Sequence, residues 1–158
     1  MPQPKPGDLI EDFTLPDQNG NEITLSQFKG SPVILFFYPR ADTPGCTIEA
    51  CGFRDQFAKL KKAGAVVLGI SRDTVRAQKK FAEKYDIQYP LLADSDETLI
   101  KRFDLLRNKT MYGKPVTGVA RTTFLIGPDR KLLHVFENVK PEGHAEEVLA
   151  LLKEKRAV

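Results

Sequence analysis

Two cysteines, Cys46 and Cys51, are the side chains of this sequence whose type and position favour redox chemistry. Cys46 closes a turn-like stretch at residues 39–46, which follows an apolar run over residues 33–38. The run predicts a buried strand, and a segment of helical periodicity begins at about Thr43. Cys46 therefore falls in the first turn of a helix, where free backbone N–H groups and the helix dipole favour a thiolate. The sequence predicts a nucleophilic sulfur where a central strand gives way to a helix.

The predicted helix, residues 43–62, carries this sulfur and a core-facing stripe on one face. The stripe follows the spacing of helical turns: Cys46, Ala50, Phe53, Phe57 and Leu60. Thr43 can cap the helix, or it can direct its hydroxyl at a group that approaches the sulfur. Pro39 and Pro44 stiffen the turn, and Gly45 permits close approach to its backbone.

The spacing P-x-x-x-T-x-x-C, filled by Pro39, Thr43 and Cys46, resembles the active-site signature of the peroxiredoxins. Cys51 is similar in position to a second cysteine of the branch called bacterioferritin comigratory protein, or peroxiredoxin Q. The resemblance covers nearly the whole chain. It implies a thioredoxin-like fold, with residues 1–158 as a single domain.

The order of predicted elements indicates an α/β protein. An N-terminal β-hairpin with Gly20 in its turn comes first, and residues 105–120, which show weak periodicity, are expected to form a loop toward the site. The remaining elements alternate: strands at 33–38, 65–71, 89–93, 122–126 and 131–137, and helices at 43–62, 74–85, 97–103 and after 143. This order predicts a central mixed β-sheet flanked by helices on both faces.

The resemblance implies roles for four further residues. Arg121, at the start of a predicted strand, matches an arginine that contacts the thiolate and the peroxide, a task that suits the fixed fork of a guanidinium. Glu49 matches a glutamate that orients this arginine. Thr43 matches a residue that forms a hydrogen bond with the peroxide, and Pro39 matches a residue that shields the site from water. Without the resemblance, Arg121 would be interpreted as a surface residue and Glu49 as an exposed helix carboxylate.

Cys51 is implied to resolve the sulfenic acid that peroxide leaves on Cys46. On an intact helix, Cα atoms five residues apart are separated by roughly 8–9 Å, whereas a disulfide needs ~4.4–6.8 Å. We therefore expect oxidation to unwind the first turns of the helix. Gly45 and Gly52 flank this segment and lower the cost. The alternative is that Cys51 is a small buried apolar residue.

Composition excludes several other classes of function. With 158 residues, 41% hydrophobic and 28% charged, the chain has the composition of a globular domain. The net charge of +3 is spread among acidic residues, so we expect no nucleic-acid surface. No apolar run approaches ~20 residues and the N-terminus has no signal-like segment, so we expect a cytoplasmic protein with no membrane contact. His134 and His144 have no ligand spacing to the cysteines, so we expect no metal site and two surface or half-buried histidines.

Taken together, the resemblance implies a thiol-dependent peroxidase that reduces hydrogen peroxide and organic hydroperoxides without a metal or organic cofactor. Thioredoxin or glutaredoxin is the implied electron donor. A resolving cysteine within the chain needs no second subunit, so we expect a monomer. Two alternatives stay open: a dithiol–disulfide oxidoreductase, which the C-x-x-x-x-C spacing disfavours, and a redox sensor that uses the same cysteines.

Overall fold

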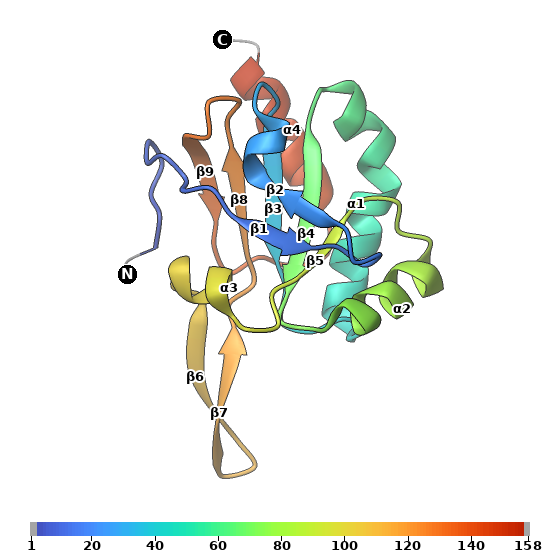
Figure 1. Ribbon diagram of the computed structural model, residues 1–158, viewed down its shortest axis with the longest axis vertical. Helices are drawn as coiled ribbons and strands as arrows, with labels where there is room; N and C mark the ends of the chain where they lie inside the picture. Colours follow the sequence, from blue (N-terminus) through green and yellow to red (C-terminus); the bar gives the residue numbers. More distant parts are fainter. Residues whose placement is uncertain (1–2, 157–158) are drawn as a thin grey trace.

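A mixed β-sheet lies at the centre of residues 3–156, the part of the chain that the computed structural model describes. Its strand order is β5–β4–β3–β8–β9 (Figure 1). The strands are β3 (Val33–Phe37), β4 (Val66–Ser71), β5 (Leu91–Ala93), β8 (Thr122–Ile126) and β9 (Leu132–Phe136). β3 pairs in parallel with β4 and antiparallel with β8. Every residue of β3 is buried, as expected for a central strand that is covered on both faces.

One face of the sheet carries three helices: α1 (Pro44–Lys62), α2 (Val75–Tyr85) and α4 (His144–Arg156). Alternate residues of β3 point to the two faces, and Ile34 and Phe36 point to this one. Phe36 stacks on Phe53 of α1 with ring centroids 4.6 Å apart. The stripe predicted for the helix over residues 43–62 is thus the one that packs on the sheet.

The other face is covered by the N-terminal hairpin and a short helix. The hairpin pairs β1 (Thr14–Pro16) with β2 (Glu22–Thr24) and leads into a 3₁₀ helix, η1 (Leu25–Phe28). The short helix is α3 (Thr98–Arg102), which lies on the same face as the hairpin (Figure 1). The predicted mixed sheet, with helices on both faces and an N-terminal hairpin, is confirmed.

The loop predicted for residues 105–120 is wrong. This segment forms β6 (Leu106–Met111) and β7 (Lys114–Val119), an antiparallel hairpin that extends away from the body (Figure 1). Its turn residues Tyr112 and Gly113 both have positive φ, as in a type I′ turn. Most of the hairpin is exposed on both faces, so its sequence lacks the apolar alternation by which a half-buried strand is recognised.

Candidate active site

Cys46 lies in the first turn of α1 and is fully buried. The first intrahelical bond runs from the Thr47 N–H to the Thr43 carbonyl, 2.8 Å. The N–H groups of Gly45 and Cys46 therefore precede the helical ladder, at the positive end of the helix dipole, where Cys46 also lies. This is the environment that the sequence predicts for the nucleophile.

Arg121 reaches this sulfur from the sheet. It directly precedes β8, which is paired with β3, so the sheet brings it to the edge where α1 begins. Its Nη2 donates to Sγ of Cys46 at 3.4 Å, and its Nη1 donates to Oε1 of Glu49 at 2.8 Å. Burial opposes the guanidinium charge, but Glu49 and Cys46 outweigh it and raise the pKa of Arg121. The arginine is thus a fixed, fully charged bridge between the two side chains.

Glu49 is completely buried, so its interpretation as an exposed helix carboxylate is wrong. Burial raises the pKa of Glu49 to about 7, although Arg121 acts in the opposite direction. Among the described residues, its second oxygen, Oε2, has no hydrogen-bond partner. Glu49 therefore holds Arg121 in place but is itself in an unfavourable environment.

Gly45 allows the arginine to lie across the helix start. A Cβ at this position would be 3.0 Å from Nη2 of Arg121 and 3.4 Å from Cγ of Pro141. The distance to Nη2 is tighter than an ordinary contact of a Cβ atom, so any side chain here would compete with the guanidinium. The close backbone approach predicted for Gly45 is confirmed, and Arg121 is the group that approaches.

Thr43 occupies the N-cap position of α1, but its side chain makes no capping bond. Its hydroxyl donates instead to the carbonyl of Arg40 at 2.9 Å. Of the two alternatives for Thr43, the side-chain cap is therefore wrong. Because the hydroxyl hydrogen is committed, the oxygen is left as an acceptor.

Pro39 lines a cavity of about 520 Å³ next to the turn that carries Thr43. The opposite wall comes from the β6–β7 hairpin, through Lys109, Val116 and Thr117. Cys46 does not line this cavity, so the approach of residues 105–120 to the site stays a prediction. Arg40 also lines this cavity.

The turn before α1 is held by acidic residues that sequence reasoning missed. Oδ2 of Asp73 accepts hydrogen bonds from the backbone N–H of Ala41 at 2.7 Å and from the hydroxyl of Ser71 at 2.6 Å. Asp42 accepts from Tyr85. Asp42 has a φ of 61°, a left-handed conformation that aspartate tolerates better than most residues. The only signal in the sequence was an aspartate within a proline-rich turn.

Cys51 lies further along α1 and is half-buried. Burial raises the pKa of the Cys51 thiol; nearby Arg54 opposes this effect and Asp55 adds to it. Both cysteines are free thiols, and α1 is continuous through them. The two sulfurs are thus unpaired on an intact helix.

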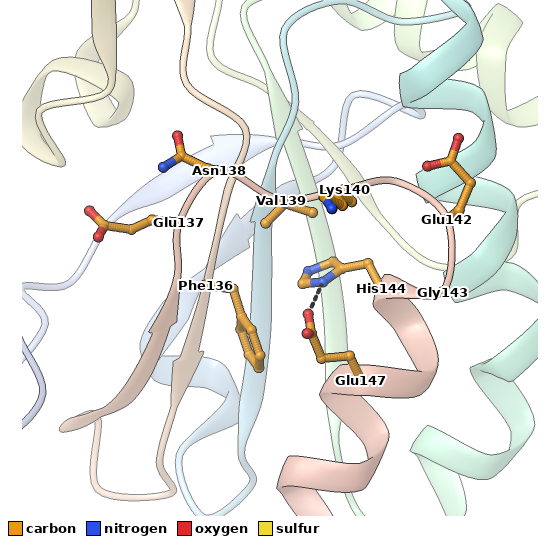
Figure 2. Close-up of a pocket in the computed structure, with 9 residues that line it drawn as sticks. All are labelled: Phe136, Glu137, Asn138, Val139, Lys140, Glu142, Gly143, His144 and Glu147. Carbon is orange, nitrogen blue, oxygen red and sulfur yellow. Dashed lines mark hydrogen bonds and ion pairs between the residues drawn. The ribbon is translucent and has the colours of Figure 1, made fainter.

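His144 is buried, contrary to the expectation of a surface or half-buried residue, whereas His134 is half-buried as expected. The His144 ring nitrogens lie 2.7 Å from the Thr123 hydroxyl and 2.9 Å from a Glu147 carboxylate oxygen. Figure 2 shows the ring between the end of β9 and the start of α4, beside a cavity of about 440 Å³. Within residues 3–156, no group of three or more His, Cys, Asp or Glu side chains is arranged to hold a metal ion, and no helix is long and apolar enough to cross a membrane.

A mixed sheet with a buried thiol at the start of α1 and an arginine on its sulfur defines a thiol-based oxidoreductase. Comparison with known proteins identifies the class further. Residues 6–135 match the AhpC/TSA family. Peroxiredoxin Bcp of Escherichia coli K12 is 45% identical over 150 residues, covering 95% of this chain and 96% of that protein.

Solved structures give the same result. A cysteine-to-serine mutant of PrxQ from Xylella fastidiosa is similar with a TM-score of 0.93 and 37% identity, covering 98% of each chain. Bacterioferritin comigratory protein of Xanthomonas campestris, described for its alkyl peroxide reduction activity, has a TM-score of 0.86 and 39% identity, covering 90% of this chain and 91% of that one. The chain belongs to the AhpC/TSA family of peroxiredoxins, in the branch of Bcp and PrxQ. It is a thioredoxin-like thiol peroxidase, and its sequence contains two cysteines, Cys46 and Cys51.

Proposed function

We propose that Cys46 attacks the peroxide while Arg121 and Thr43 hold it. The observation that carries this assignment is the guanidinium of Arg121, which lies 3.4 Å from the sulfur and is fixed by Glu49. A cation at this place stabilises the thiolate before attack. It also faces the position where negative charge develops during attack.

In the first step, the Cys46 thiolate attacks one peroxide oxygen and the O–O bond breaks. The leaving oxygen departs with the electron pair and takes up a proton, which gives water or an alcohol, and Cys46 becomes a sulfenic acid. Arg121 stabilises the charge on the leaving oxygen. The Thr43 oxygen, whose own hydrogen is donated to Arg40, accepts a hydrogen bond from the attacked hydroperoxide. Pro39 shields the cavity side of the site from water.

In the second step, the Cys51 thiol attacks the sulfenic sulfur, so that a 46–51 disulfide forms and water leaves. The helix is continuous, and Cα atoms five residues apart on a helix are too distant for a disulfide by about 2–4 Å. The first turns of α1 therefore unwind before the bond forms. Burial raises the pKa of the Cys51 thiol in the folded helix, so this group attacks after the turns before it have unwound.

A dithiol protein then reduces the disulfide, and we assign this role to thioredoxin, with glutaredoxin as the second choice. Exchange with two donor thiols restores Cys46 and Cys51. Because the resolving thiol lies in the same chain, the catalytic cycle needs one subunit, and we propose a monomer. A reductant of this kind implies the cytoplasm. Because the Xanthomonas campestris relative is described for its alkyl peroxide reduction activity, we propose alkyl hydroperoxides as substrates in addition to hydrogen peroxide.

The test measures NADPH consumption with thioredoxin, thioredoxin reductase and either hydrogen peroxide or an alkyl hydroperoxide. Wild type should turn over, and Cys46→Ser should be inactive. Cys51→Ser should complete one turnover and then stop until a small thiol is added. Continuous turnover of Cys51→Ser with thioredoxin alone would show that Cys51 does not resolve the sulfenic acid.

A further inference from the structure

The segment that must unwind is fixed at its upstream end by the last turn of α2. Asp42 accepts hydrogen bonds from the Tyr85 hydroxyl at 2.7 Å and from Nζ of Lys84 at 2.9 Å. These donors lower the pKa of Asp42, so the carboxylate stays charged and remains an acceptor. We call the Asp42–Tyr85 contact the upstream anchor.

A second tyrosine fixes the downstream end. The Tyr89 hydroxyl donates to the backbone carbonyl of Ala50 at 2.7 Å, and the tyrosine is buried. Its ring packs between Phe36 of the sheet and Phe57 of α1, at centroid distances of 5.9 and 6.0 Å. Ala50 directly precedes Cys51, so this downstream anchor holds the backbone at the resolving cysteine.

Between the two anchors, α1 packs Cys46 against the sheet, and the side-chain hydrogen bonds of its described residues run through Arg121 alone. Arg121 contacts Cys46 and Glu49. Oxidation of the thiolate to a sulfenic acid removes the negative charge at Cys46 and weakens that contact. Neither tyrosine contact involves a group that changes in the reaction. A redox-sensitive contact is therefore bracketed by two contacts that are insensitive to redox state.

We propose that Tyr85 and Tyr89 are positioning residues that confine unwinding to residues 43–49, so that Cys46 moves to Cys51 while Cys51 stays on the body of the protein. The proposal rests on the disulfide step of the proposed function. Seven helical residues span ~10 Å, and the same residues extended reach ~23 Å. The Cα atoms of Cys46 and Cys51 have to approach by only about 2–4 Å, so the unwound segment is long enough to allow this while both of its ends stay fixed.

The experiment maps hydrogen–deuterium exchange by mass spectrometry in the reduced and disulfide forms of wild type, Tyr85→Phe and Tyr89→Phe. Each variant removes one hydroxyl and keeps the ring. Tyr38→Phe is the matched control, because the buried Tyr38 hydroxyl donates at 2.6 Å to Gln78 and not to the active-site segment. The disulfide is formed both with peroxide and with diamide, which oxidises dithiols without the peroxidase step.

In wild type and Tyr38→Phe, oxidation should speed exchange up to residue 53, because the amides of residues 50–53 bond the carbonyls of the unwound segment, and should leave 54–60 protected. Tyr89→Phe should extend fast exchange past residue 53, and Tyr85→Phe should extend it upstream toward residue 39. Rapid-quench alkylation should show that Tyr89→Phe slows disulfide formation by about two- to tenfold, the range expected for one lost hydrogen bond. Its first step, loss of the Cys46 thiol, should stay within twofold of wild type.

The outcomes separate the two proposals. If diamide gives the disulfide but wild-type fast exchange already passes residue 53, or Tyr89→Phe matches Tyr38→Phe, the anchors do not confine unwinding and this inference is wrong while the disulfide step stands. If neither oxidant links Cys46 to Cys51, the disulfide step and the inference both fail. A Tyr89→Phe disulfide that forms faster than in wild type also overturns the inference.

Discussion

Gly45→Ala should separate the stability of α1 from the activity of Cys46. Alanine at a helical position stabilises a helix by up to ~1 kcal/mol relative to glycine. The new methyl group, however, would lie 3.0 Å from Nη2 of Arg121, which is held by Glu49 and cannot retreat freely. We therefore expect a reduced protein that is as stable as wild type or more so, with a slower first step.

The magnitude follows from the contact that the methyl group disturbs. Arg121 Nη2 lies 3.4 Å from the sulfur, so a shift of a few tenths of an ångström weakens a charged hydrogen bond. Such bonds contribute ~1.5–3 kcal/mol. Loss of the lower figure slows peroxide attack about tenfold.

Gly52→Ala is the matched control on the same helix. A Cβ at Gly52 would meet only Cβ of Ala145, at 3.6 Å, an ordinary contact. Stopped mixing with hydrogen peroxide followed by rapid alkylation measures loss of the Cys46 thiol, and urea unfolding measures stability. Equal slowing of that first step in both variants would refute the reasoning, because stiffening of the helix and not displacement of Arg121 would then be the cause.

Three further changes test the same site. Burial raises the pKa of Glu49 to about 7, so the native state holds this proton to higher pH than the unfolded chain, and the free energy of unfolding should fall as pH rises from about 4.5 to 7. Glu49→Gln should remove this fall, which is up to ~3 kcal/mol between urea unfolding at pH 5 and at pH 8. The same pH dependence of unfolding in wild type and Glu49→Gln would contradict this reasoning. Arg121→Lys should slow peroxide attack ~100-fold in the same rapid-quench assay, because one ammonium group cannot bridge Cys46 and Glu49 as the forked guanidinium does. Arg107→Lys, on the exposed hairpin, is the control and should react like wild type. Thr43→Val should slow the first step by about tenfold and Thr43→Ser should restore it, whereas equal rates for both would exclude a hydroxyl contact with the peroxide.

Elements with one strong periodic signal were predictable from the sequence. The strand at residues 33–38 is a continuous apolar run because both faces of β3 are covered, and α1 shows its buried stripe because one face packs on the sheet. The β6–β7 hairpin has no such signal, since its two faces are largely exposed. Its turn at Tyr112 and Gly113 was the only local indication.

Some residues of the site could also be predicted from the sequence, and others could not. Cys46 and Thr43 belong to a contiguous motif, and Arg121 stands at the start of a strand that resembles the arginine-bearing strand of the family. Tyr89 contacts Ala50 across 39 residues of sequence, and Tyr85 contacts Asp42 across 43. Such pairs arise because α2 and the segment that leads into β5 pack against the turn before α1 and against α1 itself, and no spacing in a single sequence encodes them.

The site places opposite demands on one helix, and Glu49 reconciles them. In the mechanism that we propose, peroxide attack needs the first turns of α1 intact, because only then do Arg121 and the positive end of the helix dipole act on the sulfur. The proposed disulfide step needs the same turns unwound. Glu49 is buried with Oε2 lacking a partner among the described residues, which costs free energy that only its bond to Arg121 offsets. Once oxidation removes the thiolate charge that Arg121 also contacts, unwinding returns the Glu49 carboxylate to water. The helix start is thus stable while Cys46 is a thiolate and becomes less stable when it is a sulfenic acid, so the chemical step itself favours the conformational change that must follow it.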